Sequence, residues 1–157
     1  RAEAIESEPS VPESAGQGSR LAVLLVDDDD LVRTGIAANL AAFGYEVLEA
    51  AGGGQALEVL RQRNVDLLIT DYAMPGMNGS ELIRLARVRL PALKALLITG
   101  FADLPAREQK GIELLRKPFK PDEIAARIRD VLQGEVGANV ASLVRRRAAR
   151  VENHSGA

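Results

Sequence analysis

The chain has 157 residues, of which 46% are hydrophobic and 27% are charged, and its net charge is −2. This is the length of one domain, or of one domain with tails, and the composition is that of an ordinary soluble globular protein. The chain has no cysteine, which excludes disulfides, thiol catalysis and thiolate metal sites. Its one histidine, His154, argues against a histidine-cluster metal site or a histidine-based triad. Carboxylates, hydroxyls, lysines and arginines remain as the available chemistry.

Residues 1–19 are predicted to form a flexible acidic linker. They contain four glutamates, two prolines and several serines, with almost no apolar side chains. The chain starts at Arg1 rather than at a methionine, from which we expect a fragment or a processed form of a longer protein. No apolar run reaches the roughly 20 residues of a membrane helix, and no secretion signal opens the sequence. We therefore expect a cytoplasmic location without membrane contact.

Residues 20–133 alternate between short apolar runs and amphipathic stretches, and they are predicted to form one domain. The runs have strand length and lie at 21–26, 45–48, 65–70, 95–99 and 112–115. The stretches place apolar residues three and four apart, as from Leu31 to Phe43, Ala56 to Leu60, Leu82 to Ala86 and Ile124 to Leu132. Such spacing predicts helices that pack on a sheet. Strands that are each followed by a helix predict an α/β fold, a doubly wound parallel sheet with helices on both faces.

Residues 134–157 are predicted to form a C-terminal tail that is part helical. Four apolar residues between Val136 and Val144 have helical spacing, and four arginines follow between Arg145 and Arg150. The net charge of this tail is too small to indicate a nucleic-acid interface. A solvated basic face is the plain interpretation, and a weak homodimer or partner surface is the alternative, because the apolar residues would otherwise be exposed.

Polar side chains follow four of the predicted strands, at the point where each strand ends. Asp27 to Asp30 follow the first strand, Asp71 the third, Thr99 ends the fourth, and Lys117 follows the fifth. The carboxyl ends of parallel strands share one edge of the sheet, where ligands bind in such folds. Carboxylates that converge from two strands repel one another, and a divalent cation with oxygen ligands, best Mg²⁺, resolves the repulsion. A lysine and a hydroxyl opposite the acids would complement a phosphoryl group, so the set indicates phosphoryl transfer.

These residues belong to four motifs in a fixed order. They are Val26-Asp27-Asp28, the run from Asp71 to Gly79 (DYAMPGMNG), Ile98-Thr99-Gly100 and Lys117-Pro118-Phe119. The ordered set resembles the receiver domain of bacterial response regulators over roughly residues 20–133. The resemblance implies a flavodoxin-like, five-stranded parallel sheet of strand order 2-1-3-4-5, an order that is known for this fold and that the pattern alone does not give.

The resemblance also implies a role for each residue of the acidic edge. Asp71 would be the phosphoacceptor and would take a phosphoryl group from a phosphohistidine on a histidine kinase or a histidine phosphotransfer protein. Asp28 and Asp71 would bind Mg²⁺ directly, together with the main-chain carbonyl of Ala73, and Asp27 would act mainly through a bound water. Self-phosphorylation and autodephosphorylation would be the only catalysis, without multiple-turnover metabolic activity, unless the chain is a fragment of a histidine kinase.

The other two motifs would act on the phosphoryl group. Thr99 would hydrogen-bond one phosphoryl oxygen and Lys117 would pair with another, with the Lys117–Pro118 bond in the cis form. Phosphorylation would then draw Thr99 inward and move the loop at residues 100–104.

The sequence departs from the family at three positions. Leu114 stands where family members often carry an aromatic switch residue three positions before the lysine. Ala73 and Phe101, two residues after Asp71 and Thr99, offer no polar side chain to orient an attacking water. We therefore expect an aspartyl phosphate that is not unusually short-lived.

Several plainer or competing interpretations stay open at this point. Within the acidic run, Asp30 is predicted to cap the helix that begins near Leu31, and Asp29 to face solvent. A phosphatase of the haloacid dehalogenase type also uses an aspartate nucleophile and Mg²⁺, but it would need a threonine where Leu31 stands. An interaction module of the same fold that does not carry phosphate is a second alternative. Similarity between residues 97–103 and receivers of hybrid sensor histidine kinases favours the receiver module of such a kinase.

Overall fold

The computed structural model describes residues 20–100, 105 and 111–133 of the chain. The predicted linker 1–19 and tail 134–157 lie outside these described residues. So do the loop at residues 101–104 and most of the segment in which a helix was expected after the fourth strand. The three-part division of the chain therefore remains a prediction.

Strands and helices follow one another along the described part of the chain. Their bounds are β1 (Ala22–Val26), α2 (Asp30–Ala42), β2 (Glu46–Ala50), α3 (Gly53–Gln62), β3 (Leu67–Asp71), α4 (Gly79–Arg89), β4 (Lys94–Thr99), β5 (Glu113–Arg116) and α6 (Pro121–Leu132). Each predicted strand is present, with ends that move by one or two residues. Strand β3 ends one residue later than its apolar run, so that Asp71 is its last residue.

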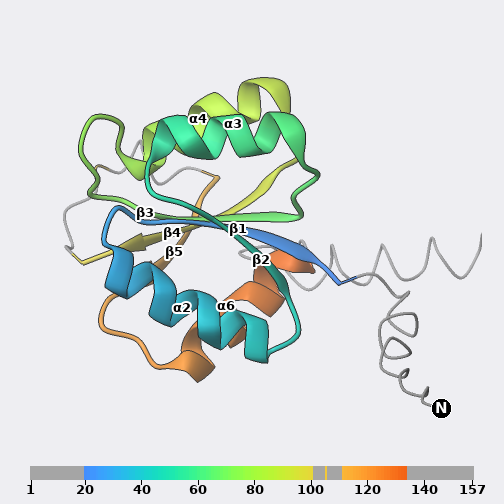
Figure 1. The fold of residues 1–157 in the computed structure, drawn as a ribbon, viewed down its shortest axis with the longest axis vertical. Coiled ribbons are helices and arrows are strands. Elements are labelled where there is room, and N and C mark those ends of the chain that lie inside the picture. The colour runs from blue at the N-terminus through green and yellow to red at the C-terminus, as the bar shows by residue number, and fades with distance from the viewer. Residues whose placement is uncertain (1–19, 101–104, 106–110, 134–157) are drawn as a thin grey trace, which may run out of the picture.

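The five strands form one parallel sheet in the order β2-β1-β3-β4-β5. Helices α2 and α6 cover one face of this sheet, and α3 and α4 cover the other (Figure 1). This confirms the predicted doubly wound fold and the strand order that the resemblance implied. Because all strands run the same way, their carboxyl ends lie along one edge.

The core has two layers, one on each face of the sheet. Alternate residues of a strand point to opposite faces, so Val23 and Leu25 pack toward α2 and α6 while Leu24 and Val26 pack toward α3 and α4. Strands β1 and β3 are buried at every position, as is β4 after its first residue. A strand with apolar neighbours on both faces cannot shift by one residue without losing both sets of contacts, so the residues at its end are held in a fixed register.

Two residues that the helical pattern placed toward the sheet are exposed. Leu31 is 85% exposed and Phe43 is 44% exposed, whereas the buried stripe of α2 consists of Ile36, Ala37 and Leu40. Leu31 belongs to the first turn of the helix, and Phe43 is the C-cap residue beyond its last turn. The prediction was wrong at both ends because spacing along a helix does not show where the helix extends past the sheet that it covers.

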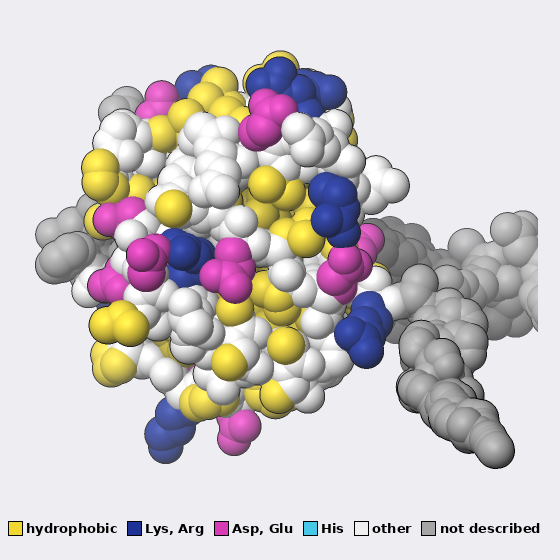
Figure 2. Space-filling model, in the orientation of Figure 1, with side chains coloured by type: hydrophobic (Ala, Val, Ile, Leu, Met, Phe, Trp, Pro, Cys, Tyr) yellow, Lys and Arg dark blue, Asp and Glu magenta, His cyan; other side chains and the backbone are white. Residues whose placement is uncertain are grey.

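Charged and apolar side chains are interspersed on the surface. On the face shown in Figure 2, apolar side chains reach the surface between acidic and basic ones, so this face has no broad field of one sign. None of the helices in the described ranges is long and apolar enough to cross a membrane.

The buried layers predict a strong contrast between two leucines. Leu97 is fully buried beneath α4, so Leu97→Ala should lower the free energy of unfolding by about 2–5 kcal/mol through lost burial and the cavity that it leaves. Leu31→Ala removes the same atoms from an exposed position and should change it by less than about 0.5 kcal/mol. Urea unfolding followed by circular dichroism measures both. Equal effects of the two substitutions would contradict this core.

Candidate functional site

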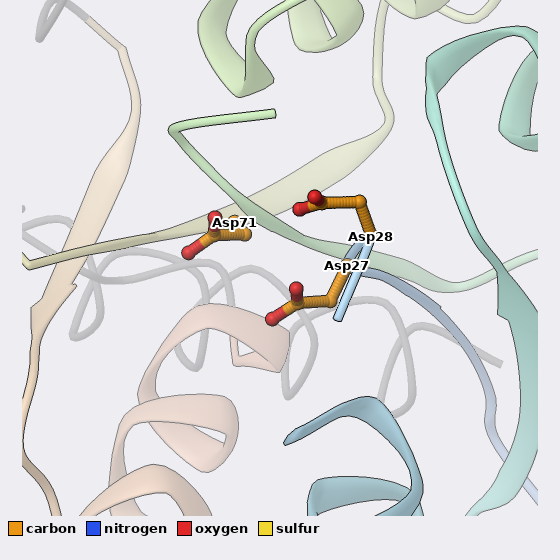
Figure 3. A group of neighbouring side chains, drawn as sticks. All are labelled: Asp27, Asp28 and Asp71. Carbon is orange, nitrogen blue, oxygen red and sulfur yellow. The ribbon is translucent and has the colours of Figure 1, made fainter. Parts of the chain in front are cut away.

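Three carboxylates meet at the carboxyl ends of β1 and β3. One oxygen from each of Asp27, Asp28 and Asp71 lies within 4.8 Å of the others. Figure 3 shows the three side chains next to one another, with those of Asp27 and Asp28 extending toward Asp71. Asp27 and Asp71 are buried, at 4% and 7% exposure, and Asp28 is exposed. The sequence predicted this convergence, and the fold produces it.

Strand pairing explains why these acids come together. Val26 of β1 lies opposite Thr70 of β3, so the next residue on each strand is an aspartate. The Asp27 N–H donates to the carbonyl of Ala50 at 3.2 Å, which ties the end of β1 to β2 as well. The sheet therefore fixes the main-chain positions of Asp27 and Asp71, which cannot move apart without disturbing buried strands.

Burial and charge together disfavour the ionised form of Asp27. Loss of water around the carboxyl group raises the pKa of Asp27, and the charges of Asp71 and Asp28 raise it further. The Asp29 N–H, which donates to Asp27 Oδ1 at 2.9 Å, lowers this pKa, as does the charge of Lys117. The rise prevails, so the fold holds the ionised form of Asp27 at an energetic cost.

Lys117 and Thr99 stand at the ends of β5 and β4, on the side of β3 that lies away from β1. The Lys117 ammonium lies 2.9 Å from Asp71 Oδ1, and its side chain is 35% exposed. The Lys117 N–H donates to the Thr99 carbonyl at 2.9 Å, and the Lys117–Pro118 bond is cis, as expected. Thr99 is 3% exposed and ends β4, one residue beyond the partner of Asp71 in the strand register. The hydroxyl-bearing and ammonium-bearing residues thus flank the same aspartate as the acids.

The loop after Asp71 is closed at its base by main-chain hydrogen bonds. The Tyr72 N–H donates to the Ile98 carbonyl and the Gly79 N–H donates to the Tyr72 carbonyl, each at 2.8 Å. A Cβ atom at Gly79 would collide with the Asp71 carbonyl and the Leu97 side chain, so only glycine fits at the start of α4. Ala73 lies exposed in this loop, where its carbonyl remains a predicted metal ligand.

The two methionines of the same loop serve in packing. Met74 is buried against the core on the α4 side, and Met77 lies against Gly53 at the start of α3. Gly52 is the N-cap of that helix, so the glycine run at residues 52–54 opens a helix. Leu114, at the position of the family's aromatic switch, is half-buried in the same layer, and Phe101 lies outside the described residues.

The helix cap within the acidic run was predicted one residue too late. Asp29, rather than Asp30, caps α2, because its Oδ1 accepts from the N–H groups of Leu31 and Val32 at 3.0 and 3.1 Å. Asp30 is the first helical residue and instead pairs with Arg33 at 2.7 Å. The four aspartates therefore divide into two that face Asp71, one cap and one ion-pair partner.

Sequence reasoning missed Arg33. Its guanidinium donates to the main-chain carbonyl of Asp27 at 2.6 Å and pairs with Asp30 and with Glu49. The hydrogen bonds to these two carboxylates, that to Asp30 first, raise the pKa of Arg33. The three-residue spacing between Asp30 and Arg33 was the only sign of this role in the nearby sequence. The other two acceptors are the main-chain carbonyl of Asp27 and Glu49 of β2, which a sequence pattern does not reveal.

The site fits a hard divalent cation. Its three acidic side chains offer only oxygen atoms, two of the three are buried, and their mutual repulsion is what a bound cation removes. The exposed position of Asp28 leaves one side open, as Mg²⁺ requires when it keeps waters or a phosphoryl oxygen among its ligands.

Comparison with known proteins identifies relatives of the chain. Residues 23–129 match the response regulator receiver domain family. The sensor kinase CckA of Brucella abortus (strain 2308) is 34% identical over 134 residues, which are 80% of this chain but only 14% of that kinase.

Two solved structures share the fold over most of their own length. The chemotaxis protein CheY4 of Vibrio cholerae has a TM-score of 0.68 and 29% identity, and the match covers 72% of this chain and 99% of that one. The receiver domain of the hybrid histidine kinase CckA has a TM-score of 0.62 and 37% identity, with 71% and 98% covered. The chain is thus similar to whole receiver domains and spans a small part of the kinase.

The raised pKa of Asp27 predicts how stability depends on pH without metal. The folded state binds this proton more tightly than the unfolded state, so ionisation of Asp27 destabilises the fold, and the cost appears as the pH rises through the folded pKa. In EDTA at pH 8, Asp27→Asn should therefore raise the Tm, and the gain should shrink toward pH 4. Thermal unfolding by circular dichroism measures this.

The matched control is Asp130→Asn, an equivalent change at an exposed position of α6, which should leave the Tm within about 1 °C. Saturating Mg²⁺ should reverse the order of wild type and Asp27→Asn, because the neutral amide of the variant offers the ion no charge. A wild type that is the more stable of the two in EDTA at pH 8 would contradict the assignment of strain to Asp27.

Proposed function

Because the chain belongs to the response regulator receiver domain family, we propose that it is a phosphoacceptor of two-component signal transduction, with residues 20–133 as the receiver unit and Asp71 as the acceptor. One observation carries the proposal: Asp71 lies within 4.8 Å of two further carboxylates and 2.9 Å from the Lys117 ammonium. A carboxylate flanked by acids on one side and by a cation on the other can share a metal ion and a phosphoryl group at once.

Asp27, Asp28 and Asp71, together with the Ala73 carbonyl, are the proposed ligands of Mg²⁺. When bound, the ion offsets the repulsion among the acids and the charge of the incoming phosphoryl oxygens. The family resemblance gives Asp28 and Asp71 the role of direct ligands and Asp27 an indirect role through a bound water, and we propose the same division here.

The chain's own residues supply the nucleophile and its surroundings. An Asp71 carboxylate oxygen attacks the phosphorus of a phosphohistidine; the new P–O bond forms as the P–N bond breaks, and the imidazole, protonated on its other nitrogen, leaves as a neutral ring. Lys117 turns from the Asp71 oxygen to a phosphoryl oxygen, which its partly exposed stem allows. The hydroxyl of Thr99, at the end of β4, donates a hydrogen bond to a second phosphoryl oxygen.

The proposed donor is a histidine kinase or a histidine phosphotransfer protein. Similarity to the sensor kinase CckA, and to the receiver domain of the hybrid histidine kinase CckA, supports the receiver module of a hybrid kinase. We place the protein in the cytoplasm, because phosphohistidine donors are made there from ATP. Phosphorylation is expected to act on Thr99 and on residues 100–104, of which 101–104 lie outside the described residues.

The proposal predicts a single phosphorylation at Asp71. Incubation with a small-molecule phosphodonor and Mg²⁺ should add one phosphoryl mass to wild type and to Asp130→Asn, and none to Asp71→Asn, because an amide nitrogen is no nucleophile at neutral pH. Intact-mass spectrometry reads the result directly. EDTA should abolish the gain. A phosphoryl group on Asp71→Asn, or none on wild type, would refute the assignment and would favour a phosphate-free interaction module.

Replacement of Lys117 is expected to have opposite effects on metal binding and on phosphorylation. Its ammonium repels a cation bound at Asp71, so Lys117→Met should tighten Mg²⁺ binding by about fivefold. The same change removes a group that stabilises charge on the phosphoryl oxygens, and should slow phosphorylation by about 100-fold. Calorimetric Mg²⁺ titration and mass spectrometry measure the two. Arg116→Met, which removes the exposed neighbouring cation, should leave the phosphorylation rate within about threefold; parallel losses in Lys117→Met would argue for misfolding instead.

A further inference from the structure

Arg33 lies in the first turns of α2 and reaches back toward the acidic site. Helical side chains lean toward the N-terminus of their helix, which brings this guanidinium to the carboxyl end of β1. The side chain is only 14% exposed. Its Nη1 donates to the main-chain carbonyl of Asp27 at 2.6 Å.

Each nitrogen of the guanidinium serves a different acceptor. Nη2 donates to Asp30 Oδ1 at 2.7 Å and Nε to Glu49 Oε1 at 3.0 Å, in addition to the Nη1 bond. These acceptors belong to the exit of β1, the start of α2 and the end of β2. The planar guanidinium holds its donors in a fixed fork, which a lysine ammonium cannot reproduce.

The carbonyl that Arg33 holds belongs to the peptide that joins Asp27 to Asp28. In a strand, neighbouring side chains point to opposite faces, yet these two carboxylates face the same Asp71. The chain must therefore leave strand geometry immediately after Val26, the last residue of β1. A peptide unit is planar, so a hydrogen bond to its carbonyl restricts the orientation of the whole unit. It thereby restricts the directions in which the side chains of Asp27 and Asp28 leave the main chain.

Two carboxylates outside the acidic site neutralise the charge of Arg33. Asp30 and Glu49 both pair with the guanidinium, whereas Lys117 pairs with the Asp71 carboxylate itself. An effect of Arg33 on the site is therefore expected through the backbone of Asp27.

We propose that Arg33 is a positioning residue that holds the Asp27–Asp28 peptide so that both carboxylates face Asp71. Its partners are the Asp27 carbonyl, Asp30 and Glu49, so it would act on the site through the backbone and not as a ligand. The inference rests on the proposed function, since it concerns the same Mg²⁺ site, and extends it to a residue outside the receiver motifs.

A positioning role and a charge role of Arg33 predict opposite changes in Mg²⁺ affinity when the residue is replaced. If Arg33 acted as a nearby cation, its removal would tighten Mg²⁺ binding, as at Lys117. If it holds the peptide, its removal lets Asp27 and Asp28 turn away and weakens binding. The direction of the change in Mg²⁺ affinity therefore separates the two roles.

The experiment is a titration of the ¹⁵N-labelled full chain with MgCl₂ alone, followed by NMR at a temperature where circular dichroism shows every variant folded. Arg33→Met should weaken Mg²⁺ binding by about tenfold, the usual scale for residues that orient metal ligands, and Arg33→Lys should weaken it too. Before metal is added, the Asp28 amide resonance should already move in both variants. The matched control is Arg63→Met, which loses another arginine ion pair to β2, that with Glu46 at 2.7 Å, and should stay within about twofold of wild type.

Wild-type or tighter Mg²⁺ binding by Arg33→Met would overturn the inference. A lower Tm beside that unchanged affinity would mark Arg33 as part of a purely structural ion pair. Should Arg33→Met fail to fold, Arg33→Lys decides alone by the same criteria. A wild type that neither binds Mg²⁺ nor accepts a phosphoryl group refutes the proposed function and this inference together. A wild type that does both, beside an Arg33→Met that binds normally, refutes only the inference.

Discussion

Repulsion among three carboxylates is the constraint around which this edge of the molecule is built. Asp27 and Asp71 stand at the ends of adjacent buried strands whose side chains are packed on both faces. The register of those strands cannot relax to separate the charges without exposing core residues. Burial first, and the charges of Asp71 and Asp28 after it, raise the pKa of Asp27, and a bound cation would offset this cost by supplying positive charge. The features that make the ionised site costly are thus the ones that favour a cation there.

Strand order then decides which chemistry reaches Asp71 from each side. Because β3 lies between β1 and β4, the acids of the β1 exit approach from one side, and Thr99 with Lys117 approaches from the other. The main-chain bond from Lys117 to Thr99 ties the ends of β4 and β5 together. Asp71 therefore lies between the acids of the β1 exit and the Lys117 ammonium, which is why we propose it, rather than Asp27 or Asp28, as the acceptor.

The sequence predicted what depends on apolar pattern and missed what depends on distant or main-chain partners. Strands, layers and the converging acids follow from runs of buried residues, which is why β1 and β3 were found and their aspartates placed together. The strand order required the resemblance, because pairing between β1 and β3 joins residues far apart in the chain. The cap was assigned to Asp30 instead of Asp29 because both residues precede the apolar stripe of α2, and the pattern does not show at which of them the first helical turn begins. Arg33 was missed because its partners are a carbonyl and Glu49 of β2.

Two cations near one acidic site can coexist with a metal ion only if neither competes with it permanently. Arg33 meets this condition by balance, since Asp30 and Glu49 pair with its guanidinium and its bond to Asp27 involves the backbone alone. Lys117 meets it by exposure: its ammonium pairs with Asp71, but its side chain is 35% exposed, which leaves room for the ammonium to turn. Under the proposed function, a lysine that pairs with Asp71 before transfer is then available to the phosphoryl oxygens afterwards. The rigid guanidinium and the movable ammonium therefore suit different tasks, and exchanging the two residue types would fail at both positions.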